Sequence, residues 1–171
     1  MANVNKIEQY NKGTVFPDSY EETYLATRHI SDIKLNIPEE ALRILKEKID
    51  EKGLYFGDES VLRNIIAGII KGNIILQGPP GTGKTTLAKL ICDVFNVSYT
   101  EATTNSDWTT YDSIGGLQPT ANDEGREVIE GKNGYVVSSV LKCCDLIVQH
   151  ENNGGKLQGN WLILDELNRC E

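Results

Sequence analysis

The chain has 171 residues, of which 39% are hydrophobic and 25% are charged, a composition typical of a soluble globular domain. Its formal net charge of -8 argues against broad electrostatic affinity for nucleic acid, although a local basic patch in an oligomer stays compatible with it. No apolar run is long enough to span a membrane and no signal peptide opens the chain, so we expect a cytoplasmic protein without a membrane partner. The four cysteines form no zinc-binding pattern, and we expect them to be reduced thiols.

Residues 1–53 are predicted to be an N-terminal extension that contains one helix. Its first part is polar and carries no catalytic pattern, and residues 33–37 alternate like a short strand. A helix is expected at about 38–52, because Pro38 suits a first helical turn and the two acids after it face the positive end of the helix. Gly53 is expected to end this helix.

The next stretch predicts a helix, a strand, a loop and a second helix in succession. Asp58 is a good N-cap for a helix with a broad apolar face, which ends at Lys71. Residues 73–77 form an apolar run long enough for one buried strand. After the loop, apolar residues recur at helical spacing from Leu87 to Phe95.

The loop between them, residues 78–85, reads Gly-Pro-Pro-Gly-Thr-Gly-Lys-Thr and matches the phosphate-binding pattern G-x-x-x-x-G-K-[ST]. Its glycines let the backbone turn amide groups inward around a phosphate, at a helix N-terminus that favours anions. Lys84 is predicted to reach the β- and γ-phosphates and to assist catalysis, and the Thr85 hydroxyl is predicted to ligate Mg²⁺. The expected nucleotide-binding residues are Gly78, Pro79, Pro80, Gly81, Thr82, Gly83, Lys84, Thr85 and Thr86.

The second half of the chain begins with a strand predicted at 97–102 and a polar stretch. A hairpin is then expected at 126–138, with strands at 127–129 and 135–137 around a turn at Asn133-Gly134, since Asn-Gly is a strong turn signal. Ser138 or Ser139 is expected to cap the helix that follows.

Residues 161–166 read Trp-Leu-Ile-Leu-Asp-Glu, an apolar strand that ends in two acids. Asp165 is predicted to hold Mg²⁺, directly or through water, and Glu166 to be the catalytic residue that polarises the attacking water. Asn168 and Arg169 follow at once. Arg169 either pairs with a surface acid or lies near the nucleotide or a neighbouring subunit, and sequence spacing leaves both alternatives open.

Taken together, these residues resemble the AAA+ ATPases, and specifically the dynein-related group that includes MoxR-like and McrB-like proteins. The resemblance rests on the Walker A element at 78–85 and on the Walker B element at 161–166, which continues as Asp-Glu-Leu-Asn-Arg. Residues 107–117 are similar to the start of that group's second helix, and a stretch at about 117–138 is similar to its hairpin insert. The resemblance covers residues 54–171, which we expect to be the N-terminal part of an AAA+ ATPase domain.

The resemblance implies an α/β fold of the P-loop NTPase type, a three-layer α/β/α arrangement with parallel strand order 5-1-4-3-2. It implies ATP and Mg²⁺ as cofactors, assembly into a homo-oligomeric ring (commonly a hexamer), and hydrolysis coupled to remodelling or translocation of a macromolecule. Strands 4 and 5, sensor 1, sensor 2, the arginine finger and the helical lid have no counterpart here, so we expect a chain truncated after Walker B that hydrolyses ATP slowly by itself. The residues implied to flank the adenine are Tyr55, Phe56 and Gly57.

Three other functions compete with this ATPase. One is a McrB-like GTPase subunit of a DNA restriction system, although no guanine-recognition signature is evident. Another is a nucleotide-binding regulatory module without turnover. A small-molecule kinase is the most distant alternative, because Glu166 beside Asp165 suits activation of water better than transfer to an alcohol.

Overall fold

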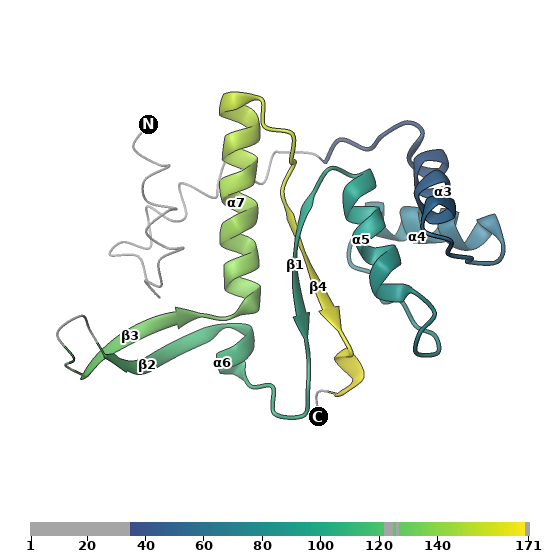
Figure 1. Cartoon of the computed structure of the whole chain (residues 1–171). Coiled ribbons are helices and arrows are strands. Elements are labelled where there is room, and N and C mark those ends of the chain that lie inside the picture. Colours follow the sequence, from purple (N-terminus) through teal and green to yellow (C-terminus); the bar gives the residue numbers. More distant parts are fainter. Residues whose placement is uncertain (1–34, 122–124, 126, 170–171) are drawn as a thin grey trace. The chain divides into compact units, whose positions relative to one another are not determined.

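The computed structural model describes residues 35–121, 125 and 127–169, which divide into two compact units. One unit comprises residues 36–97, and the other comprises the described residues from Ser98 onward together with Leu35 (Figure 1). Most of the predicted N-terminal extension lies outside the described residues, and so does the first part of the strand predicted at 33–37. Residues 35–37 adopt no strand, so the described part of that prediction is wrong.

Helix α3 (Ala41–Glu51) lies within the helix predicted at about 38–52. It ends where the sequence indicates, because Gly53 adopts a left-handed φ of +65°, a conformation that glycine reaches without steric cost. One stripe of the helix is buried at a spacing of four residues, as an amphipathic helix requires. The buried residues of this stripe are Ala41, Leu45 and Ile49.

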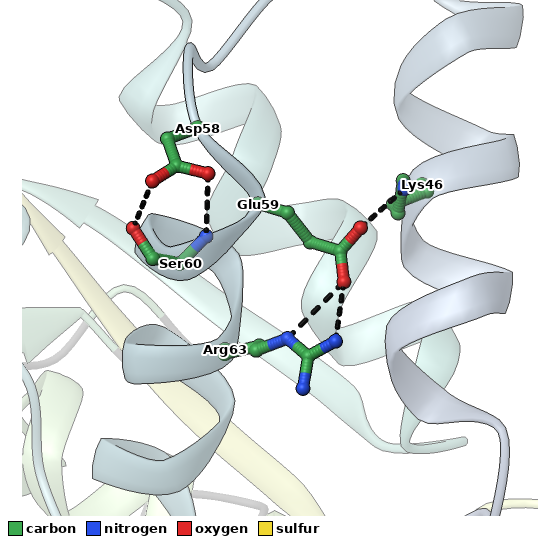
Figure 2. Close-up of polar contacts among 5 residues, drawn as sticks. All are labelled: Lys46, Asp58, Glu59, Ser60 and Arg63. Carbon is green, nitrogen blue, oxygen red and sulfur yellow. Dashed lines mark hydrogen bonds and ion pairs between the residues drawn. The ribbon is translucent and has the colours of Figure 1, made fainter.

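Helix α4 (Glu59–Lys71) begins after Asp58, whose carboxylate accepts a hydrogen bond from a first-turn backbone amide at 3.3 Å, as predicted for this N-cap. Glu59 pairs with two cations, Lys46 of α3 at 2.7 Å and Arg63 at 2.6 Å (Figure 2). Hydrogen bonds from Lys46 and then from Arg63 lower the pKa of the Glu59 carboxyl. Only the Lys46 pair joins α4 to α3, because Arg63 lies on α4 itself. Since these side chains are exposed, both pairs add little stability.

Helix α5 (Lys84–Val94) follows the glycine-rich loop and supplies much of the core of its unit. Helix α3 packs against both α4 and α5. Leu45 of α3 and Phe95, just after α5, are completely buried, and Cys92 is 2% exposed. Desolvation raises the pKa of the Cys92 thiol to about 11, so this cysteine behaves as a small apolar core residue.

The prediction of a strand at 73–77 is wrong: this segment has no regular secondary structure. Ile74 is half-buried and lies so close to Gly68 of α4 that a Cβ there would be 2.9 Å from its methyl group, whereas Ile75 is 84% exposed. An isolated extended segment needs a hydrogen-bonded neighbour to become a strand. No strand within the described residues pairs with it, which is the physical reason for the failed prediction.

In the other unit, strands β1 (Ser98–Thr103) and β4 (Asn160–Asp165) form a parallel pair in register from Ser98↔Asn160 to Thr103↔Asp165. Helix α7 (Tyr135–Asn153) packs on both strands (Figure 1). The pair agrees with neighbouring strands 2 and 3 of the order 5-1-4-3-2, which makes this a partial α/β fold of the expected kind. Although α7 has 19 residues, no helix in the described ranges is long and apolar enough to cross a bilayer.

The hairpin lies earlier in the chain than predicted. Strands β2 (Gly115–Ala121) and β3 (Glu127–Asn133) pair antiparallel after the short helix α6 (Thr110–Ser113), and residues 135–137 belong to α7. The Asn133-Gly134 turn was wrong because Gly134 has a φ of -75°, whereas a two-residue hairpin turn of this kind requires positive values. Glycine is required there for space, since a Cβ would lie 2.4 Å from the backbone of α6.

Helix α7 begins at Tyr135, so neither Ser138 nor Ser139 is its N-cap. Ser139 is instead 5% exposed, and its hydroxyl accepts a hydrogen bond from Nδ2 of the equally buried Asn160 at 2.8 Å. The same nitrogen donates to the Thr100 hydroxyl at 2.9 Å. The Asn160 amide therefore ties α7 to both strands of the parallel pair.

Replacing Asn160 with alanine should destabilise the protein by about 1–3 kcal/mol, because the buried Ser139 hydroxyl and the half-buried Thr100 hydroxyl lose their donor. The free energy of unfolding is measured by urea denaturation of the parent and the variant. Gln149→Ala on the exposed side of α7 is the control and should change stability by less than about 0.5 kcal/mol. Equal effects of the two substitutions would show that the Asn160 bridge is dispensable.

The Cys92 thiol should react with a thiol reagent only when the chain unfolds, because its raised pKa keeps it protonated far above neutral pH. We expect slow labelling at pH 8 and fast labelling in urea, measured in a chain whose other three cysteines are replaced by serine. The folded state retains this proton more tightly than the unfolded state. This contribution to stability is therefore complete below the ordinary thiol pKa of 9.0 and is lost as the pH rises towards 11. Native labelling as fast as labelling in urea would contradict this.

Candidate functional site

The glycine-rich loop enters α5 through two residues in left-handed conformations. Gly81 has a φ of +75° and Gly83, the N-cap of α5, has a φ of +80°. Side chains with a Cβ disfavour these values, which explains why the motif needs glycine at both positions. The loop thus leads directly into the N-terminus of an 11-residue helix, where the helix dipole favours an anion.

Lys84 lies at the centre of this loop. Its ammonium group donates hydrogen bonds to the carbonyl oxygens of Gly78 at 3.0 Å and Pro79 at 2.7 Å, and the Thr82 hydroxyl donates to the same Pro79 carbonyl at 2.9 Å. The loop is therefore closed around the lysine. Phosphate oxygens are stronger partners for an ammonium group than neutral carbonyls, so a nucleotide can compete for this cation.

The segment predicted to flank the adenine lies beside the loop. A Cβ on Gly83 would be 3.1 Å from the Leu54 side chain and 3.5 Å from the Phe56 ring, so both pack closely on this glycine. Tyr55 between them is 87% exposed, and Gly57 turns the chain with a φ of +63°. No pattern in the sequence indicated Leu54, which shares this packing.

Thr85 and Thr86 occupy the first turn of α5, where Thr85 is half-buried and Thr86 is exposed. Pro80 and Gly81 lie in the loop before the helix, and both are exposed. No group of three metal-ligating His, Cys, Asp or Glu residues occurs in the ranges the structure describes. In nucleotide-binding sites Mg²⁺ commonly keeps several waters and binds one or two carboxylates together with the phosphates of the substrate.

The acidic strand end belongs to the other unit, and it is built on β4. Asp165 is the last residue of the strand, and its Oδ1 accepts a hydrogen bond from the backbone amide of Glu166 at 2.9 Å. Glu166 has a φ of +56°, an unusual value for a residue with a Cβ. Backbone outliers of this kind occur often at functional sites.

Arg169 pairs with Glu166, its guanidinium lying 3.0 Å from the Glu166 carboxylate. Arg169 is the last residue of the short 3-10 helix η2 (Leu167–Arg169), which also contains Asn168, and Glu166 immediately precedes this helix. The alternative that places Arg169 near the nucleotide or a neighbouring subunit stays a prediction, and the alternative that pairs it with an acid agrees with the structure. That acid is the predicted catalytic residue itself, a pairing that the spacing of three residues could have indicated.

Thr104 is a residue that sequence reasoning missed. It is 1% exposed, and its hydroxyl donates to the backbone carbonyl of Glu166 at 2.8 Å. It follows the last residue of β1, directly beside the end of β4 in the parallel register. Its position just after a predicted strand is visible in the sequence, but the register that brings it to Glu166 is not.

The glycine-rich loop and the acidic strand end define the class of protein as a P-loop nucleotide-binding module. The sequence model of the AAA domain, dynein-related subfamily, matches residues 73–171, and the chain belongs to this family. This confirms the predicted family. Membership identifies an ATPase-type module and implies nucleotide binding with Mg²⁺ as the usual metal.

Similar proteins include the mitochondrial Lon protease homologues of Candida dubliniensis and Candida albicans. Each is 28% identical over 127 residues, which make up 71% of this chain and 10% of the relative. The chain therefore spans about a tenth of the length of the curated relatives it matches. No solved structure matches the chain with significance.

Replacing Lys84 with alanine should weaken Mg·ATP binding about tenfold or more, because a charge-assisted hydrogen bond to phosphate is lost. Calorimetric titration of the parent and the variant measures the change in affinity. Lys71→Ala removes an exposed lysine from the same unit and should leave the affinity unchanged. An unchanged affinity in Lys84→Ala would exclude the assigned role of this loop.

Proposed function

We propose that this chain is the nucleotide-binding part of an AAA ATPase that couples Mg·ATP hydrolysis to remodelling or translocation of a macromolecule. The observation that carries the proposal is the Lys84 ammonium group inside a glycine loop that opens onto the N-terminus of α5. That arrangement suits a polyphosphate because cation, amides and helix dipole act on the same anion.

Each residue of the loop has a defined part in this proposal. The backbone amides of Gly81, Thr82 and Gly83 cradle the β-phosphate, whereas Pro79 and Pro80 have no N–H to donate. Lys84 moves from the Gly78 and Pro79 carbonyls onto the β- and γ-phosphates. Thr85 ligates Mg²⁺, which neutralises charge on the phosphates when it is bound. Because Lys84 already points into the loop, binding exchanges one set of oxygen acceptors for a stronger one.

The acidic end of β4 supplies the residues that carry out hydrolysis in this proposal. Asp165 holds Mg²⁺, directly or through its water, and Glu166 orients and polarises the water that attacks the γ-phosphorus. The Glu166 carboxylate is engaged in the ion pair with Arg169. Glu166 therefore has to exchange part of this contact for the attacking water.

The complete protein is proposed to work as a homo-oligomeric ring in which neighbours complete each site. The net charge of -8 makes a polyanionic target unfavourable unless a basic patch forms on assembly. Within the described residues, the one long apolar segment without a regular partner is 73–77, in which Ile75 is 84% exposed. Assembly would supply an environment for such a segment, because exposed unpaired strands otherwise promote aggregation.

Glu166→Gln should keep Mg·ATP bound and slow hydrolysis about a hundredfold or more, because an amide cannot accept a proton from water. Single-turnover assays with protein in excess over labelled ATP detect even slow cleavage, and calorimetry gives the affinity. Glu130→Gln, an exposed change on β3, is the matched control. Hydrolysis within about twofold of the parent in Glu166→Gln would remove Glu166 from the catalytic role.

A parallel titration with GTP tests nucleotide preference, and tighter GTP binding would contradict the ATPase assignment.

A further inference from the structure

The backbone of Glu166 lies in an unfavourable conformation that other groups must maintain. Its φ of +56° brings its Cβ close to backbone oxygen, and a glutamate has no side-chain route to relieve this. Within the described residues, Asn96 is the only other non-glycine residue with a positive φ. Without such groups, residue 166 would adopt a negative φ, which has the lower energy for a residue with a Cβ.

Thr104 is placed to maintain the positive φ of Glu166. Its backbone amide donates to the Asp165 carbonyl at 2.9 Å, which continues the hydrogen bonding of the parallel strand pair by one residue. Its hydroxyl lies 2.8 Å from the Glu166 carbonyl oxygen and 3.2 Å from that of Asp165. A hydroxyl carries one proton, so the shorter contact is the principal hydrogen bond.

The location of Thr104 makes this bond hard to replace. The residue is 1% exposed, so water cannot easily take over the lost hydrogen bond. The Glu166 carbonyl also accepts the Arg169 amide at 2.9 Å, and this second bond belongs to the local turn and moves with it. Among the residues that the structure describes, Thr104 is the one that connects Glu166 to a different strand, and it therefore fixes the peptide relative to the sheet.

We propose that Thr104 is a positioning residue for hydrolysis, which holds the Glu166 backbone so that the carboxylate reaches the attacking water. This rests on the proposed function, in which Glu166 polarises that water. In this proposal Thr104, which is 1% exposed, acts through Glu166 and contacts neither the nucleotide nor the attacking water. Loss of its hydroxyl should lower the rate of the chemical step without changing nucleotide affinity, because only the position of Glu166 changes.

The first test is structural and needs no turnover. In the isotope-labelled chain, the Glu166 amide–Hα coupling and carbon chemical shifts distinguish a positive from a negative φ. Thr104→Val should move Glu166 to a negative φ, whereas Thr104→Ser, which keeps the hydroxyl, should leave it positive. Thr103→Val, which removes an exposed hydroxyl from the neighbouring residue, is the control and should also leave it positive. If Thr104→Val does not fold, Thr104→Ala takes its place. An unchanged positive φ in the hydroxyl-free variant overturns the proposal.

The second test measures single-turnover hydrolysis and Mg·ATP affinity of the same variants. Thr104→Val should hydrolyse about tenfold to a hundredfold more slowly at unchanged affinity, and Thr104→Ser should recover most of the rate. In a Glu166→Gln background, Thr104→Val should add no further loss, because it acts through Glu166. A wild-type rate in Thr104→Val, with Glu166→Gln still slow, overturns the positioning role and leaves the proposed function intact. A wild-type rate in Glu166→Gln overturns both.

Discussion

The need of every buried backbone amide and carbonyl for a hydrogen-bond partner decides most of this structure. Strands β1 and β4 satisfy it through a parallel ladder, and α7, which connects the hairpin to β4, covers both strands. Thr104 extends the same ladder past the last paired residue and so reaches the predicted catalytic glutamate. In the other unit, residues 73–77 lack such a partner and stay irregular despite their strand-like composition.

Features determined by local residues could be predicted from the sequence, and features determined by distant partners could not. The N-cap at Asp58, the helix end at Gly53 and the helix after the glycine loop each depend on residues only a few positions away. All three predictions agree with the structure. The segment 73–77 depends on a neighbour far away in the chain, which a local pattern cannot supply. The Asn133-Gly134 signal was misleading because Gly134 is required for close contact with α6 and not for a turn.

The candidate site follows the same division. The loop residues 78–85 are recognisable because their chemistry needs particular residue types in sequence, and Lys84 points into the loop as that chemistry requires. Pairing of Glu166 with Arg169, and support of Glu166 by Thr104, arise where strand ends meet a short helix. Residues 104 and 166 are brought together only by the strand register, so nothing in the local sequence indicates that contact.

The relative strengths of the contacts to Glu166 indicate which one controls it. A non-glycine residue in a sparsely populated backbone region costs about 1–3 kcal/mol. The ion pair with Arg169 joins side chains that are 62% and 39% exposed, and surface pairs of this kind contribute about 0–1 kcal/mol, which is too little to offset that strain alone. Leaving a buried polar group unsatisfied costs about 1–3 kcal/mol, and the Thr104 hydroxyl is nearly inaccessible to water. The buried hydroxyl therefore determines the backbone of Glu166, and Arg169 acts only on the position of its carboxylate.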